Sequence, residues 1–142
     1  PAQMRALQQD PALIAPGLEE LLRWASPVYH FRRTATRDVQ MHGKTIRQGD
    51  KVVMWFAAGN RDDSQFDRPY ELDVTRTNVD HLTFGKGGPH LCLGNALARM
   101  EVRLMFEELL PRIGDLQLTG DVARVRSNFV NGIKKFPVAW TP

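Results

Sequence analysis

The sequence predicts an α+β fold that is mainly helical, and three features of the 142 residues lead to this prediction. Helical patterns of apolar residues occur near the start of the chain and again over residues 95–110. Strand-type residues, broken by glycine turns, occupy residues 28–55. Short strands around a turn at Asn131-Gly132 are expected in residues 116–140. Because no repeat or low-complexity linker divides the chain, we expect a single unit.

Two helices are expected at the start of the chain. Residues 2–9 have the pattern of the last turns of a helix, which Asp10-Pro11 stops. A stronger helix is expected over residues 18–25, and Pro27 closes it because the residue before a proline disfavours the helical conformation. The apolar face of this second helix is expected to consist of Leu18, Leu21, Leu22 and Ala25.

The middle of the chain has the composition of strands and loops. Residues 28–55 are broken at His42-Gly43 and at 48–50, which predicts a hairpin followed by a buried strand. Residues 60–80 are polar, contain a proline and lack a regular period. We expect an ordered meander or a loop there, and loops of this length inside compact domains are usually functional.

A third helix is expected over residues 95–110, directly after a glycine-rich segment, and Pro111 and Gly114 end it. Its charged residues lie largely away from its apolar side. The buried side of this helix is expected to consist of Leu97, Met100, Leu104 and Met105.

The composition limits the classes of function. Hydrophobic residues make up 42% of the chain and charged residues 25%, which is typical of a globular chain and argues against disorder. The longest apolar run, residues 52–58, is too short to span a membrane. We expect a cytoplasmic location, because no basic-then-apolar leader opens the chain. A net charge of +3 without basic runs gives no reason to expect a nucleic-acid partner.

The segment that is most informative about chemistry is residues 84–94, Phe-Gly-Lys-Gly-Gly-Pro-His-Leu-Cys-Leu-Gly. Its glycines permit backbone conformations and close approaches that side chains would forbid. Cys92 stands just before a helix, where unpaired N–H groups and the helix dipole favour a thiolate over a thiol. Gly94 leaves space beside the sulfur, as if a flat ligand lay against the loop.

Three interpretations of Cys92, the single cysteine, are open at this point. A lone cysteine is most often a small buried hydrophobic residue. A zinc ion held by His90 and Cys92 would need two further ligands, and no residues at a recognisable spacing supply them. A haem iron held by a thiolate needs one cysteine only, and the glycine frame favours this interpretation.

The segment resembles the haem-binding loop of the cytochrome P450 family, the haem-thiolate monooxygenases. The family motif is commonly Phe-Gly-x-Gly-x-His-x-Cys-x-Gly, and here Gly88-Pro89 stand where the shorter form has one position. Longer loops of this kind occur in some bacterial members, including lipid and sterol oxidisers. The motif is that of soluble bacterial members, so the resemblance implies this type, and the longer loop bears only on the expected class of substrate.

Three further positions agree with the family in order and separation. Glu20 and Arg23 match the Glu-x-x-Arg helix, and residues three apart share a helix face and can pair. Arg76 matches the meander arginine that joins this pair, and residues 60–62, Asn-Arg-Asp, match a tract before the meander. We expect Glu20, Arg23 and Arg76 to form one partly buried structural cluster. The resemblance covers essentially all of residues 1–142.

The resemblance implies a set of cofactor-binding residues for haem b. The implied set is Cys92, His90, Arg33, Phe84, Gly85, Leu93 and Gly94. Cys92 would be the catalytic residue and the axial thiolate ligand of the iron. The N–H groups of Leu93 and Gly94 would moderate the charge on the sulfur.

His90 and Arg33 match family positions that hold the haem propionates, and an arginine suits a carboxylate geometrically. Arg32 is a competing candidate for the role of Arg33, which could also be a solvated strand residue. Phe84 would form an apolar wall near the cysteine, or belong to the ordinary core.

Substrate and partner contacts are also implied by the resemblance. The substrate-pocket candidates are Val28, Tyr29, Phe31, Phe129 and Val130, which could equally be packing residues. Arg99 and Arg103 lie on the surface that receives an acidic electron donor, often a ferredoxin, although a solvated helix face also explains such a pair.

The function implied by the resemblance is insertion of one atom of O2 into a C–H bond of an apolar substrate of lipid or sterol type. Electrons would come from an external donor. The family's long helix with an acid–alcohol pair, and an earlier helix with basic residues, have no match here. We therefore expect the C-terminal, haem-binding portion of a longer monooxygenase, inactive alone and pairing with a second copy or with the missing N-terminal portion. The alternatives are a non-catalytic haem-binding or structural fragment and, more remotely, a zinc-binding or interaction domain.

Overall fold

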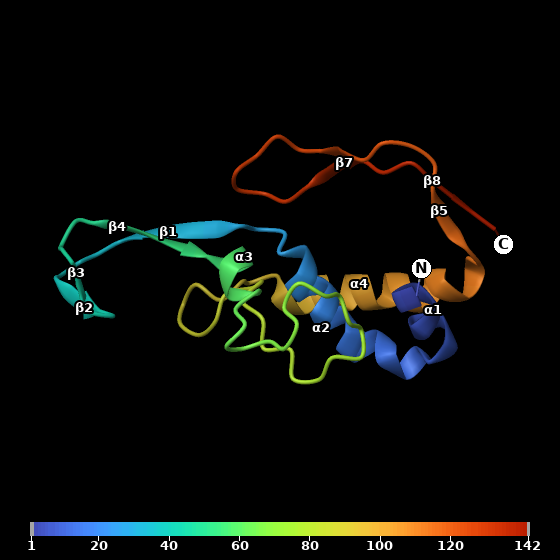
Figure 1. The fold of residues 1–142 in the computed structure, drawn as a ribbon, viewed down its shortest axis with the longest axis horizontal. Helices are drawn as coiled ribbons and strands as arrows, with labels where there is room; N and C mark the ends of the chain where they lie inside the picture. The colour runs from blue at the N-terminus through green and yellow to red at the C-terminus, as the bar shows by residue number, and fades with distance from the viewer. Residues whose placement is uncertain (1, 142) are drawn as a thin grey trace.

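The structure, a computed structural model, describes residues 2–141 as short helices and strand pairs in an elongated arrangement (Figure 1). In chain order the α-helices and 3-10 helices (η) are α1 (Ala2–Gln9), η1 (Pro11–Leu13), α2 (Ile14–Ala25), α3 (Phe56–Gly59), α4 (Asn95–Leu109) and η2 (Leu110–Arg112). The strands are β1 (His30–Thr34), β2 (Val39–Met41), β3 (Lys44–Ile46), β4 (Lys51–Trp55), β5 (Leu116–Leu118), β6 (Ala123–Arg124), β7 (Ile133–Lys135) and β8 (Val138–Trp140). The predicted α+β class is confirmed.

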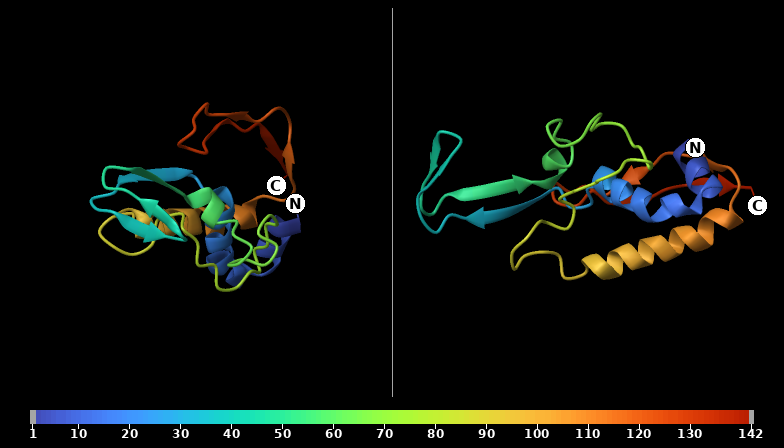
Figure 2. Two further views of the ribbon diagram at one scale, coloured as in Figure 1. Left: turned by 60° about the vertical axis from the view of Figure 1, so that its left-hand side comes forward. Right: turned by 90° about the horizontal axis from the view of Figure 1, so that it is seen from below.

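The strands of the described chain form antiparallel pairs: β1 with β4, β2 with β3, β5 with β8 and β6 with β7. The two hairpins β1–β4 and β2–β3 together make an arm that projects from the helices (Figures 1 and 2). The predicted buried strand is wrong, because β4 alternates between exposed and half-buried residues. A two-stranded sheet cannot bury its own faces, and each face stays exposed unless another element packs against it.

Helix α2 begins at Ile14, four residues before the expected start. Pro16 therefore lies in the first turn, where its missing N–H costs no helical hydrogen bond. The expected apolar face is correct only in part, since Leu18 is buried but Ala25 is exposed. The most deeply buried side chains of α2 are charged, and they face the irregular segment that follows α3.

The predicted meander over residues 60–80 is confirmed, and the chain continues without helix or strand through the Cys92 segment to residue 94. Asn60 is fully buried and connects this segment to its surroundings. Its side-chain amide donates to the hydroxyls of Ser26 and Thr83 at 3.0 and 3.1 Å, and its side-chain oxygen accepts from the Leu82 N–H at 2.7 Å. The meander is therefore an ordered part of the fold.

Helix α4 forms over nearly the predicted range and packs beside α2 (Figure 2). The prediction of its buried side is wrong, because the apolar side chains named for it are each about half exposed. These are Leu97 (54%), Met100 (49%), Leu104 (46%) and Met105 (52%). After Asn95, the half-buried positions of α4 are instead Ala98, Arg99, Val102 and Phe106. The apolar side of α4 is therefore only partly covered within residues 2–141.

The buried apolar cluster of the described residues is small. It consists of Leu7, Ile14, Val74 and Leu110, and Phe106 of α4 packs against it. The tail is attached at the other end of α2, where the Asn131 amide donates to the Ala25 carbonyl at 2.7 Å. Neither Asn131 nor Gly132 has a positive φ, so the predicted tight Asn-Gly turn is wrong. Within residues 2–141, every helix is too short or too polar to cross a membrane.

Candidate functional site

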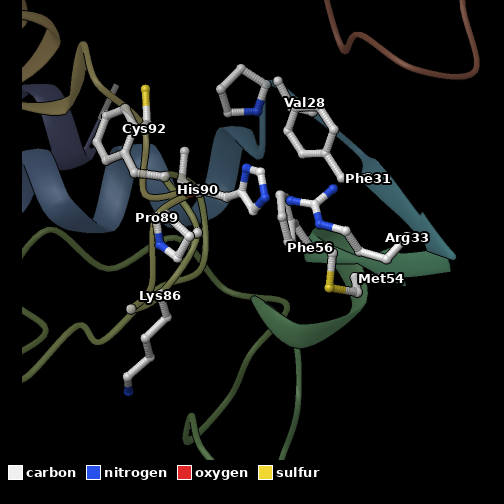
Figure 3. A pocket seen from close by; sticks show the side chains of 14 residues that line it. Val28, Phe31, Arg33, Met54, Phe56, Lys86, Pro89, His90 and Cys92 are labelled. Atoms are coloured by element: carbon white, nitrogen blue, oxygen red, sulfur yellow. The ribbon is translucent and has the colours of Figure 1, made fainter. Parts of the chain in front are cut away.

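A cavity of about 590 Å³ lies between the Cys92 loop and the β1–β4 hairpin (Figure 3). Apolar side chains form the wall on the hairpin side: Val28, Phe31, Met54 and Phe56. Phe84, Gly85, Pro89, His90 and Cys92 lie on the loop side. Cavities of this size bind small molecules and cofactors in many proteins. Met54 and Phe56 had no motif in the sequence to single them out, although β-strand pairing places Met54 opposite Phe31.

The Cys92 loop has the backbone geometry that its glycines predict. Gly85, Gly87 and Gly88 have φ values of 75°, 62° and 71°, in the left-handed region that favours glycine. The Cys92 N–H donates to the Phe84 carbonyl at 3.0 Å, and the Cys92 carbonyl accepts from the Asn95 N–H at 3.2 Å. The backbone of the cysteine is therefore fixed at both ends, while its side chain is exposed.

The space beside the sulfur is open. A Cβ placed on Gly94 would lie 4.0 Å from Cys92 Sγ and would meet no other atom of the described chain. Leu93 is fully exposed, and neither residue lines the cavity. Among the described residues no acceptor pairs with the N–H groups of Leu93 and Gly94. These N–H groups are therefore available to the sulfur or to a ligand.

The charged groups of the cavity are basic, and no aspartate or glutamate lines it. Arg33 lines the cavity and Arg32 does not, so the position of Arg33 favours it over Arg32 as a candidate. Arg33 donates to the Arg32 carbonyl at 3.0 Å and has no carboxylate partner within residues 2–141. Figure 3 shows His90 facing the hairpin side chains, whereas Lys86 extends away and pairs with Asp80. The cavity therefore favours an anionic group.

The predicted cluster of Glu20, Arg23 and Arg76 is confirmed. Arg23 donates from Nε and Nη2 to the two oxygens of Glu20 at 2.6 and 2.7 Å, and both side chains are fully buried. Arg76 Nε donates to Glu20 at 3.2 Å, and so does the Asp73 N–H at 3.1 Å. Burial acts to raise the pKa of Glu20, but these donors outweigh it and hold the pKa below its ordinary value.

Arg23 also binds the meander directly. It donates to the carbonyls of Asn60, Pro69 and Glu71 at 2.7, 2.9 and 3.2 Å. A planar arginine side chain has five N–H donors, and here all three of its nitrogens are engaged. The cluster therefore joins α2 to the segment that leads into the Cys92 loop.

The substrate-pocket candidates separate into two groups. Val28 and Phe31 line the cavity, whereas Tyr29, Phe129 and Val130 do not. The Tyr29 N–H donates to the Phe129 carbonyl at 2.9 Å, and the Phe129 ring meets that of Phe31 edge-on at 5.5 Å. Val130 forms a β-bridge with Val28, so these residues contact the residues of the cavity wall without lining the cavity themselves.

The two arginines named for an electron donor have different surroundings. Arg99 pairs with Glu19 at 2.7 Å and is partly buried, so it is not a free surface charge. Arg103 is half exposed and pairs with Glu107 one turn along α4 at 3.5 Å. Within residues 2–141, no three His, Cys, Asp or Glu side chains cluster as a metal site would need, so the zinc alternative lacks ligands there.

Comparison with known proteins relates this chain to one family. The family model described as cytochrome P450 matches residues 3–113. Linalool 8-monooxygenase of Pseudomonas putida is 46% identical over 142 residues, which are 100% of this chain and 35% of that protein. A methyl-branched lipid omega-hydroxylase of Mycobacterium tuberculosis is 46% identical over 124 residues, which are 87% of this chain and 29% of that protein.

Among solved structures, cytochrome P450-153 from Novosphingobium aromaticivorans superimposes with a TM-score of 0.94 at 39% identity. The match covers 99% of this chain and 36% of that structure. The chain thus spans about a third of the length of the relatives that it matches.

Proposed function

This chain belongs to the cytochrome P450 family, and we propose that it forms the C-terminal, haem-binding portion of a longer monooxygenase. The family binds haem. The proposal covers residues 1–142 as a single unit and is supported by the share of each relative that the chain matches. The observation that carries it is the exposed Cys92, fixed by its backbone at the edge of an apolar cavity that contains basic but no acidic side chains.

The residues of the cavity fit haem b. Cys92 would ligate the iron through its thiolate, and the unpartnered N–H groups of Leu93 and Gly94 would stabilise the negative charge on the sulfur. Arg33 and His90 would bind the two propionates, which suits a cavity without a competing carboxylate. When bound, the haem supplies the iron chemistry that activates O2.

The remaining residues of the site would orient the cofactor and the substrate. Phe84 and Gly85 form the loop-side wall, where the absence of a Cβ at Gly85 lets a flat ring approach the backbone. Phe31, Met54 and Phe56 form an apolar surface opposite them, which would help to exclude water from a reacting C–H bond. Val28 lies on the same wall.

We propose an apolar substrate of lipid or sterol type, with O2 as co-substrate. The apolar wall supports this class, and the names of two relatives refer to linalool and to methyl-branched lipids. A ferredoxin-type donor would supply the electrons near Arg103, the more exposed of the two arginines. The cytoplasmic location expected from the sequence stays a prediction.

The test is the absorption spectrum of the reduced protein with carbon monoxide, measured for the protein that contains this chain. A haem with thiolate ligation gives a Soret band displaced far to the red. We expect this band in the wild type and not in Cys92→Ser, because a neutral hydroxyl cannot supply the thiolate charge. Haem without the displaced band in the wild type would favour the non-catalytic alternative, and no haem at all would refute both.

A further inference from the structure

Glu19, the residue before Glu20, belongs to a second cluster of charged and polar side chains, which does not bind the meander as the Glu20 cluster does. The other members of this second cluster are His81 and Arg99. Its two carboxylate oxygens accept from Nε and Nη2 of Arg99 at 2.7 and 2.9 Å. This two-point pairing joins α2 to α4. Burial acts to raise the pKa of Glu19, but Arg99 and His81 hold it below its ordinary value.

His81 is the second partner of Glu19. Its Nδ1 accepts from the Thr83 N–H at 3.1 Å, so Nε2 carries the proton that is donated to Glu19 Oε2 at 3.0 Å. The His81 side chain is 2% exposed, and its burial lowers the pKa of His81 in spite of the nearby carboxylate. A neutral His81 leaves Arg99 as the single cation paired with Glu19.

Both partners of Glu19 contact the ring of Phe84. The Arg99 guanidinium carbon lies 4.6 Å from the centroid of the Phe84 ring, and the His81 ring lies 5.9 Å from it. The Phe84 carbonyl in turn accepts the Cys92 N–H. A continuous set of contacts therefore runs from Glu19 through Arg99 and His81 to Phe84 and the backbone of Cys92.

We propose that Glu19, His81 and Arg99 are positioning residues, which act on Cys92 by holding the Phe84 ring and so the carbonyl that fixes the cysteine backbone. This inference rests on the proposed function, because it treats Cys92 as the haem ligand. It also gives Arg99 an internal role in place of the expected contact with an electron donor.

The physical argument depends on orientation and on charge. A half-buried phenylalanine without fixed neighbours can rotate, whereas a guanidinium on one side and an imidazole on another restrict Phe84. The positive charge of Arg99 is compensated by Glu19, so the Cys92 loop has a neutral pair behind it. Removing the charge of Glu19 leaves a net positive charge behind the loop, whereas removing the charge of Arg99 leaves a net negative one.

Two substitutions, Glu19→Gln and Arg99→Met, test the proposal in the whole protein that contains this chain, with Arg99→Lys as a milder variant. The control is Glu107→Gln, which removes an acidic charge from an exposed ion pair with Arg103 on α4, the helix that carries Arg99. Hydrogen exchange is measured at the Cys92 amide and, as a reporter of global stability, at the buried Val74 amide. The second measurement is the reduction potential of the haem iron at about pH 8, where His81 remains neutral.

We expect the Cys92 amide to exchange on the order of ten-fold faster in Glu19→Gln and Arg99→Met, with a smaller increase in Arg99→Lys and none in Glu107→Gln. Exchange at Val74 should change less than at Cys92. The potential should rise in Glu19→Gln, which leaves a positive charge, and fall in Arg99→Met, which leaves a negative one.

Unchanged exchange at Cys92 in both variants would overturn the proposal, as would equal acceleration at Cys92 and Val74, since that indicates general destabilisation. Shifts of potential with the same sign would also contradict it. If the wild type fails to show the thiolate spectrum, the proposed function fails, while the exchange at Cys92 still decides whether the cluster positions the loop.

Discussion

Replacing Arg23 with alanine should strongly destabilise the protein. Arg23 is fully buried and donates to both oxygens of Glu20 and to the carbonyls of Asn60, Pro69 and Glu71. Breaking a buried ion pair by removing one partner costs roughly 3–5 kcal/mol. Glu20 keeps Arg76 and the Asp73 N–H, which lowers this cost.

The backbone carbonyls that lose their hydrogen bond from Arg23 raise the cost of the substitution again. A buried polar group without a partner costs about 1–3 kcal/mol, and the carbonyls of Asn60 and Pro69 lose the Arg23 donor. We therefore expect a loss at the upper end of the range, near 5 kcal/mol. Because whole domains are stable by only about 5–15 kcal/mol, Arg23→Ala should mostly fail to fold or to retain haem.

The assay is unfolding in guanidinium chloride, followed by circular dichroism, with Arg23→Lys as a variant that retains the charge. The matched control is Arg68→Ala, because Arg68 pairs with Asp67, Glu71 and Asp73 on the surface. We expect only a small change in the control, since exposed pairs contribute little. A similar loss in Arg23→Ala and Arg68→Ala would refute the reasoning.

The pH dependence gives the cluster a second readout. Because the folded-state pKa of Glu20 is below its ordinary value of 4.5, its contribution is complete above that pH and is lost as the pH falls toward the folded-state value. Wild-type stability should therefore decrease with acidification below about pH 4.5, and this decrease should be smaller in Glu20→Gln.

The remaining predictions concern the haem site and the isolated chain. Cys92→Ala should lose the red-displaced band with carbon monoxide but remain folded by circular dichroism; a retained band would refute axial ligation by Cys92. Arg33→Gln should bind haem more weakly than Arg32→Gln, as measured by haem transfer to an acceptor protein, and equal effects would refute the assignment of the propionate site. The 142-residue chain alone should be haem-poor and inactive, and it should associate with other copies, because the apolar side of α4 is about half exposed. Haem stoichiometry and mass in solution, measured with and without the rest of the protein, check this prediction. An active, haem-loaded monomer would contradict it.

The features that could be predicted from the sequence have local causes. The glycines of the Cys92 loop permit left-handed backbone angles at low cost, and the structure has those angles at Gly85, Gly87 and Gly88. The pair Glu20 and Arg23 could be found because a spacing of three places both side chains on one helix face. The α4 boundaries follow from the flanking Gly94 and Pro111.

The features that could not be predicted depend on partners far along the chain. A helical period shows that Leu97 and Leu104 share a face, but not whether an element within these residues covers it, and both remain about half exposed. Likewise, the sequence places Arg99 four residues before Arg103, whereas its partner Glu19 is 80 residues away. Met54 lines the cavity because of its pairing register with Phe31, which depends on how the hairpin closes.

The two neighbouring glutamates of α2 explain how one helix can organise the whole site. Successive helix residues point about 100° apart, so Glu19 and Glu20 face different surroundings. Glu20 binds Arg23 and Arg76 and so holds the meander, while Glu19 binds Arg99 and His81 and so holds α4 and the residues beside Phe84. The Cys92 loop connects these two parts, because it follows the meander and precedes α4. Its position is therefore determined from both ends by adjacent carboxylates on the same helix.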